Sequence, residues 1–297
     1  MNHAEATSTI ETRVIPNTVV FGFVKALAQE LSQGRVELPS VPEIVLKVQR
    51  TMADENVTNE IVVRVLGSEP MLAGKLINMA NSAALNTSGR KVADLRMAVA
   101  RVGFNIVRSA ALSFAIEQLK RAAEYKHLES MLDGLWKISV HVAALSHVIA
   151  RRFTSLNGDT ALLTGVLHNV GRIYILTRAS QHPALFADQL TYQSIVRDWH
   201  TNVAKALLEN WQVADEIIEA VASHEDLGRE ARGPVMLTDV LALATLMHAH
   251  SLKGSDADPN EPLVNALRRL HIKHADCQSV IDESADDIEA LKAVLGG

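Results

Sequence analysis

Apolar residues recur along this chain at intervals of three and four, and no useful length of sequence alternates between apolar and polar residues. These residues form apolar stripes along the sequence. One stripe comprises Val20, Val24, Leu27 and Leu31, and another comprises Val99, Val102, Ile106 and Ala110. Side chains at these spacings share one face of an α-helix, whereas a half-buried strand requires a period of two. Hydrophobic residues make up 48% of the sequence but aromatic residues only 4%, so aliphatic side chains must fill the core. We therefore predict an all-α fold.

The length and charge of the chain exclude several broad classes of protein. A chain of 297 residues can bury a sizeable core, as one large domain or two modest ones. Charged residues account for 21% of the sequence, which excludes disorder across the whole chain. The net charge of -5 argues against a protein that coats nucleic acid.

Cysteine usage and hydropathy indicate the cellular compartment. The single cysteine, Cys277, excludes an internal disulfide and a cysteine-rich metal site, which suits a reducing cytosol. The first residues lack the basic and apolar stretches of a signal peptide. The most apolar run, Val235 to Met247, is shorter than the roughly 20 residues of a membrane span. We expect a cytoplasmic protein that does not contact a membrane.

Changes in composition and periodicity divide the chain into four parts. Residues 1–35 are predicted to form a loose tail and an extra helix, and residues 36–122 a first helical lobe. Residues 123–250 are predicted to form a second helical lobe. Residues 251–297 form an acidic C-terminal extension, with nine acidic against five basic residues.

The histidines do not form a recognisable ligand set. The chain has twelve of them, but no three or four ligands converge by their spacing, as a zinc or iron site requires. The run His224-Glu225-Asp226 is adjacent in sequence at a helix end, where neighbours point in different directions. No nucleophile motif, phosphate-binding loop or dinucleotide fingerprint is present. These patterns predict no catalytic residue, no bound metal and no cofactor.

A local excess of basic residues lies between Ala73 and Ala123, a segment with eight basic and two acidic residues. Arg101 and Arg108 are seven residues apart and are predicted to share one helix face. This face is either a solvated surface or a contact for an acidic partner, a phosphorylated small ligand or nucleic acid. The predicted helix–turn–helix of residues 58–80 does not favour nucleic acid, because its second helix is mostly apolar.

Asn81 follows the second of these helices. Asparagine side chains often satisfy the free backbone groups at a helix end. We therefore expect Asn81 to be at least partly buried and to tie a backbone end in the first lobe.

Seven sequence blocks resemble the HDOD domain, an HD-related output domain, in the order in which that family has them. They are Leu38-Pro39-Ser40-Val41-Pro42, Ser68-Glu69-Pro70-Met71-Leu72, Asn78-Met79-Ala80-Asn81-Ser82-Ala83, Met97-Ala98-Val99-Ala100-Arg101-Val102-Gly103, Leu135-Trp136-Lys137, Gly165-Val166-Leu167-His168-Asn169-Val170-Gly171-Arg172 and Ala206-Leu207-Leu208-Glu209-Asn210-Trp211. The resemblance covers about residues 36–250. It implies a two-lobed helical bundle whose second lobe is similar to the HD phosphohydrolases.

The same resemblance implies a degenerate metal site. Those hydrolases hold a metal with a first histidine, a His-Asp pair and a later aspartate. The corresponding positions here are Ile138, the pair His168 and Asn169, and a position near Thr245. Isoleucine cannot bind a metal, and neutral Asn169 replaces a carboxylate. Only His168 is retained, so we expect a vestigial site and no hydrolase activity.

The resemblance also implies a regulatory role, because HDOD domains are regarded as output or scaffold modules in bacterial signalling. We expect a non-catalytic module that binds a signalling protein. One alternative is a metal-dependent phosphohydrolase that acts on a nucleotide or cyclic dinucleotide through His168. Another is a sensor whose inter-lobe groove binds a phosphorylated small molecule with Arg101 and Arg108.

Overall fold

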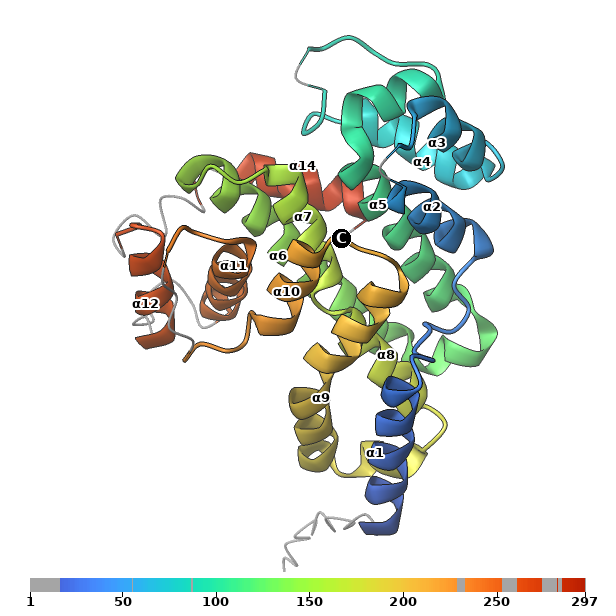
Figure 1. Cartoon of the computed structure of the whole chain (residues 1–297), viewed down its shortest axis with the longest axis vertical. Coiled ribbons are helices and arrows are strands. Elements are labelled where there is room, and N and C mark those ends of the chain that lie inside the picture. Colours follow the sequence, from blue (N-terminus) through green and yellow to red (C-terminus); the bar gives the residue numbers. More distant parts are fainter. Residues whose placement is uncertain are drawn as a thin grey trace, which may run out of the picture.

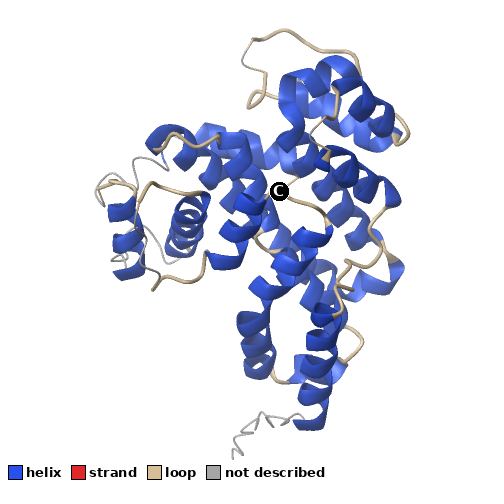
Figure 2. Ribbon diagram, in the orientation of Figure 1, coloured by secondary structure: helices blue, strands red, loops and turns tan. Residues whose placement is uncertain are grey.

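The computed structural model describes residues 17–54, 56–86, 88–228, 233–252, 261–273, 282 and 285–296. In this part of the chain every regular element is a helix and no strand occurs, which confirms the predicted all-α fold (Figure 2). The loose tail predicted for residues 1–16 and the residue Cys277 lie outside the described residues.

The first helices after residue 36 pack around α5. They are α2 (Glu43–Ala53), α3 (Asn59–Leu66), α4 (Pro70–Ala80) and α5 (Leu95–Arg121), at the upper right of Figure 1. Side-chain caps begin three of them: Thr58 accepts a hydrogen bond from the Ile61 amide, Glu69 from Met71 and Asp94 from Met97. Such caps satisfy amides that have no partner within the helix. The leucines and valines of the inner faces are buried between these helices.

Gly103 interrupts α5. Its φ of 75° and ψ of 171° lie outside the helical region, and a positive φ favours glycine over other residues. The helix therefore changes direction between its first two turns and its long second part. Asn105 then donates a hydrogen bond from Nδ2 to Thr160 Oγ1 at 2.9 Å, which joins α5 to the helix Gly158–Leu167.

The second group of helices is built around α6. In chain order its elements are η1 (Ala123–Leu128), α6 (Glu129–Phe153), α7 (Gly158–Leu167), α8 (Val170–Ala179), η2 (Pro183–Ala187), α9 (Gln189–Asn210), α10 (Asp215–Ser223) and α11 (Leu237–Ser251). Helix α7 packs so closely on α6 that a Cβ at Gly165 would lie 2.4 Å from Ala143 Cα. The N-terminal helix α1 (Asn17–Ser32) lies beside α9 (Figure 1), and its Glu30 accepts hydrogen bonds from Tyr174 and Arg178 of α8.

Helix α14 (Ala285–Leu295), near the C-terminus, lies against helices of both groups, mainly α6 and also α4 and α5 (Figure 1). Its residues Ile288, Leu291 and Leu295 are buried. Ser113 Oγ donates to the Leu295 carbonyl at 2.6 Å, and Trp136 Nε1 donates to the Gly296 carbonyl at 3.1 Å. The described end of the acidic extension is therefore an integral part of the packed fold. Helix α12 (Glu261–Arg269) packs on α11.

Helix α5 is long and apolar enough to cross a membrane by length and composition alone. However, 67% of its most apolar window is buried inside the fold. Burial of this kind is typical of a core helix in a water-soluble bundle.

Asn81 ends α4 as predicted. It is half-buried, its Nδ2 donates to the Val92 carbonyl at 2.8 Å, and its Oδ1 accepts from the Val92 amide at 2.8 Å. These two hydrogen bonds hold the connection between α4 and α5 against the end of α4. The expectation that Asn81 ties a backbone end is confirmed.

We expect Asn81→Ala to lower the free energy of unfolding by about 1 kcal/mol or more, because it leaves both backbone groups of Val92 without partners. Urea denaturation monitored by circular dichroism measures the change. Asn78→Ala, an exposed change on the same helix, serves as the control and should have little effect. Equal stability of the two variants would contradict this role for Asn81.

Candidate functional site

His168 and Asn169 lie at the junction of α7 and α8, where one helix ends and the next begins. His168 is 5% exposed and Asn169 is 2% exposed. The Nδ1 atom of His168 lies 2.6 Å from the Gly165 carbonyl, and Asn169 Nδ2 donates to the Leu135 carbonyl at 3.5 Å. Both polar side chains are thus held by backbone carbonyls beneath the surface.

Four further side chains gather around His168, and we name these five residues the His168 cluster. They are His168, Arg172 from α8, His200 from α9, His224 at the end of α10, and Glu225. The ring of His224 lies 5.8 Å from that of His168 and 6.2 Å from that of His200, between centroids. Three helix ends and the middle of α9 therefore bring together residues that are far apart in sequence.

Arg172 and Glu225 form the charged part of the cluster. The Arg172 guanidinium donates to Glu225 Oε1 at 2.6 Å and lies 3.0 Å from His200 Nε2. The same His200 nitrogen lies 2.9 Å from Glu225 Oε2. In either neutral tautomer this nitrogen is therefore engaged, because it donates to the carboxylate or accepts from the guanidinium.

The pKa values of these groups follow from burial and charge. Burial, and then the neighbouring His224, lower the pKa of His168 to about 3. Burial also lowers the pKa of His224 to about 4. Partial burial would raise the pKa of Glu225, but the hydrogen bond from His200 and the nearby positive charges lower it to about 2. At neutral pH the cluster therefore holds two neutral histidines and an ionised carboxylate paired with Arg172.

Two histidines of the cluster have a defined tautomer. A backbone carbonyl can only accept, so the Nδ1–H of His168 donates to Gly165, and the Nδ1–H of His224 donates to Val221 at 2.8 Å. The Nε2 atom of each neutral ring then carries a lone pair. Histidines that bind metals commonly have this arrangement.

The complete cluster is a poor fit for a divalent metal. A metal needs three or four converging ligands and compensating negative charge. Here Arg172 places a positive charge against Glu225 and His200, and Asn169 supplies an amide where a carboxylate would be required. Within the described residues, no group of three or more His, Cys, Asp or Glu side chains is arranged to hold a metal.

The other two positions of the predicted vestigial site lie on different helices. Ile138 on α6 packs against the hydrophobic core, and Thr245 on α11 donates to the Ala242 carbonyl of its own helix at 2.9 Å. In the described part of the chain no hydrogen bond or ion pair links either residue to His168. The buried carboxylate of α11 is instead Asp239, six residues before Thr245, which pairs with Arg269 of α12 at 3.2 Å.

Arg101 and Arg108 do not form the shared surface face that their spacing predicts. The break at Gly103 separates them, so the prediction of a common helix face is wrong. Both are half-buried and each donates to a carbonyl at the end of a helix: Arg101 Nη1 to Ala80 at 3.1 Å and Arg108 Nη2 to Met52. Burial lowers the pKa of Arg108. Their predicted contact with a partner or a phosphate is not tested by this geometry and stays a prediction.

Three other bases of this stretch are paired with acids. Lys75 pairs with Glu117, Arg96 with Glu60 and Lys120 with Asp133. Three bases of this stretch are exposed and form no ion pair with any described residue: Arg90, Lys91 and Arg121. The local basic excess is therefore used largely to hold helices together.

We expect Arg108→Met to lower the free energy of unfolding by about 1–3 kcal/mol, because the Met52 carbonyl loses a charged donor. Arg96→Met is the matched control. Arg96 forms an exposed ion pair with Glu60, and such pairs contribute about 1 kcal/mol or less. Thermal and urea unfolding of both variants measure the difference. If both variants were equally stable, Arg108 would be a surface residue, as the sequence predicts.

The model of the HDOD domain matches residues 38–227. The chain belongs to the HDOD domain family. The predicted resemblance is therefore confirmed, and the match includes all five residues of the His168 cluster.

Solved structures similar to this HDOD chain share its fold. A protein from Shewanella amazonensis SB2B, named "Putative metal-dependent phosphohydrolase", is 25% identical with a TM-score of 0.73, over 94% of this chain and 99% of that one. An HDOD domain protein with unknown function from Geobacter sulfurreducens is 24% identical with a TM-score of 0.63, over 91% and 97% of the two chains. A "Putative signal transduction protein" from Marinobacter aquaeolei VT8 is 20% identical with a TM-score of 0.64, over 100% of this chain and 69% of that one.

Among curated proteins, an uncharacterized protein from Treponema pallidum (strain Nichols) is 21% identical over 260 residues. The match covers 82% of this HDOD chain but 48% of that protein, so the chain spans about half the length of this relative.

Sequence reasoning located His168 and Asn169 but missed the rest of the cluster. His224 and Glu225 were set aside because adjacent residues diverge along a helix. In the structure α10 ends at Ser223, so both side chains turn toward His168 and His200 from beyond the helix. A sequence signal existed in Arg172, one turn after His168, but the contact with His200 depends on how α8 packs on α9.

Proposed function

We propose that this HDOD chain is a non-catalytic bacterial signal-transduction module that acts in the cytoplasm by binding another protein. The position of Arg172 carries the proposal. Its guanidinium is bonded to the one carboxylate of the His168 cluster and lies against His200. A metal ion that activates a hydroxide would need that carboxylate and that ring nitrogen as ligands. The positive charge of Arg172 beside them would repel the metal ion.

Metal binding and hydrolysis test the catalytic half of this proposal. We expect no stoichiometric iron, manganese or zinc in protein purified without chelator, measured by elemental analysis. We also expect no hydrolysis of cyclic dinucleotides or of a generic phosphodiester when these metals are added. About one metal per chain, together with hydrolysis that His168→Ala abolishes, would overturn the proposal, because sites of this class hold one or two metals.

The partner-binding half needs a separate experiment. The exposed bases Arg90 and Lys91 lie on the connection between α4 and α5 and suit an acidic partner surface. We propose this connection, next to the end of α4 that Arg101 holds, as the contact. A protein captured from native lysate should be lost when both residues are changed to Glu, and the loss should shrink at high salt. Arg197→Glu on α9, also exposed, is the control.

A metal-dependent phosphohydrolase is the second candidate function. The specific observation in its favour is that His168 and His224 both present Nε2 lone pairs toward a common region. The name of the similar Shewanella amazonensis protein agrees with it. Zinc titration of the natural chain and of Arg172→Ala separates the two candidates. A phosphohydrolase should bind zinc in the natural chain, whereas a site that Arg172 blocks should bind zinc only after Arg172→Ala.

A further inference from the structure

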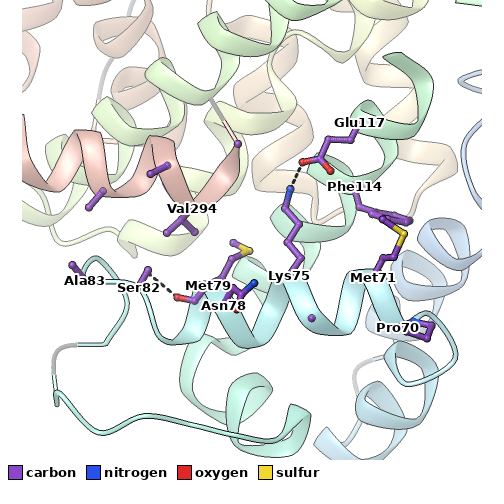
Figure 3. Close-up of a pocket in the computed structure, with 14 residues that line it drawn as sticks. Pro70, Met71, Lys75, Asn78, Met79, Ser82, Ala83, Phe114, Glu117 and Val294 are labelled. Atoms are coloured by element: carbon purple, nitrogen blue, oxygen red, sulfur yellow. Dashed lines mark hydrogen bonds and ion pairs between the residues drawn. The ribbon is translucent and has the colours of Figure 1, made fainter. Parts of the chain in front are cut away.

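A cavity of about 760 Å³ lies between α4, α5 and α14, and none of its lining residues belongs to the His168 cluster (Figure 3). Cavities of about 300–1,000 Å³ hold small organic ligands in proteins. Met71, Met79, Phe114 and Val294 supply apolar walls. Methionine and phenylalanine side chains adapt to apolar ligands of varied shape. The size and the walls therefore suit a small, mostly apolar molecule.

The charged residues of the cavity neutralise each other. Lys75 and Glu117 are the charged residues of its described lining, and Lys75 Nζ lies 2.5 Å from Glu117 Oε1 (Figure 3). Lys75 also donates to Ser113 Oγ at 2.6 Å. A charged ligand would find no unpaired opposite charge among the described lining residues, whereas an uncharged ligand leaves the ion pair intact.

Asn78 supplies a hydrogen-bonding group in the cavity. It lies on the face of α4 that also carries Met71 and Lys75, and its side chain is exposed. Among the described residues its carboxamide has no hydrogen-bond partner. An amide offers both a donor and an acceptor, so it can bind one hydroxyl or carbonyl group of a ligand.

Small residues keep the cavity open. Gly74 lies in the middle of α4, and a Cβ there would meet no atom within 4 Å, so packing does not require glycine. Glycine in a helix costs about 0.5–1 kcal/mol relative to alanine. Ala290 and Ala293 line the opposite wall on α14. A helix-weakening glycine that faces a cavity is consistent with a wall that must remain open.

We propose that this cavity binds an uncharged, mostly apolar small molecule with one hydrogen-bonding group, of the class of medium-chain alcohols and esters. The ligand lies between α4 and α5 on one side and α14 on the other, and Asn78 binds its polar group. This inference goes beyond the proposed partner binding and does not depend on it. The site and ligand also differ from a phosphate bound by Arg101 and Arg108.

Fluorescence titration of the full chain with N-phenylnaphthylamine, an uncharged apolar fluorophore, tests the proposal. Dodecanol, dodecanoate and dodecylammonium then compete as ligands of equal chain length and different charge. Gly74→Leu fills the cavity, and because leucine favours helix more than glycine does, α4 should remain folded. Gly134→Leu is the matched control, since Gly134 is exposed in the second turn of α6 and its Cβ would also meet nothing within 4 Å.

We expect saturable binding that dodecanol displaces and that Gly74→Leu weakens about tenfold or more, a loss of about 1.4 kcal/mol. Gly134→Leu should bind as the natural chain does. Dodecanoate and dodecylammonium should compete much less well than dodecanol. The proposal is overturned if no saturable binding occurs, if Gly74→Leu binds normally, or if either charged ligand competes as well as dodecanol.

Discussion

Replacing Gly171 by alanine should lower the free energy of unfolding by about 3 kcal/mol or more, at the upper end of what overpacking costs. A Cβ at this position would lie 1.9 Å from the His200 carbonyl oxygen and 2.9 Å from the Ala204 amide nitrogen. Both are backbone atoms of α9, so no side-chain rotation can relieve the contact. Helices α8 and α9 would have to separate, and Arg172 would lose its position against His200.

Gly134→Ala is the control for this experiment. Gly134 lies on α6 in open space, so alanine there should raise stability by about 0.5–1 kcal/mol. Urea unfolding curves for the two variants and the natural chain measure both changes. Similar curves for Gly171→Ala and Gly134→Ala would mean that α8 and α9 are not in close contact.

Acid should destabilise the protein between about pH 6.5 and pH 4, well above the range in which its carboxylates titrate. Burial lowers the folded-state pKa of His168 to about 3 and that of His224 to about 4, from an ordinary value of 6.5. Between these values the unfolded chain binds more protons than the folded one, so stability falls as the pH falls. Each such group contributes a slope of up to about 1.4 kcal/mol per pH unit. Glu225, with its pKa lowered to about 2, extends the loss to lower pH.

His168→Gln should reduce this slope by about 1 kcal/mol per pH unit, because glutamine does not titrate. The free energy of unfolding in urea, measured from pH 7 to pH 4.5, supplies the slope. His127→Gln, which changes an exposed histidine, should leave it unchanged. A slope for His168→Gln equal to that of the natural chain would show that burial does not lower the pKa of His168 in the folded state.

Much of the local structure could be predicted from sequence because it depends on neighbouring residues. The apolar stripe of Val20, Val24, Leu27 and Leu31 on α1 packs against the hydrophobic core as its spacing predicts. Asn81 ends α4 as expected of an asparagine at a helix end, although its side chain bonds to Val92, eleven residues further on, and not to α4 itself. The family could be identified because its motifs are short, contiguous blocks.

The arrangement of Arg101 and Arg108 shows where this reasoning fails. A separation of seven residues places two side chains on one face only if the helix is continuous. Gly103 adopts a positive φ, and the two guanidinium groups bond to the ends of different helices, α4 and α2. Whether a glycine breaks a helix depends on what its neighbours pack against, and that information is not local.

The sequence by itself determined the all-α class, the positions of most helices, the HDOD family and the pair His168 and Asn169. Only the tertiary structure decided that Arg172, His200, His224 and Glu225 surround His168, and that α14 forms one wall of an open cavity beside α4 and α5. Helical periodicity is a property of consecutive residues, so it can be read along the chain. The cluster and the cavity instead depend on how helices that are distant in sequence pack together. Close contacts, such as that of Gly171 with His200, determine this packing.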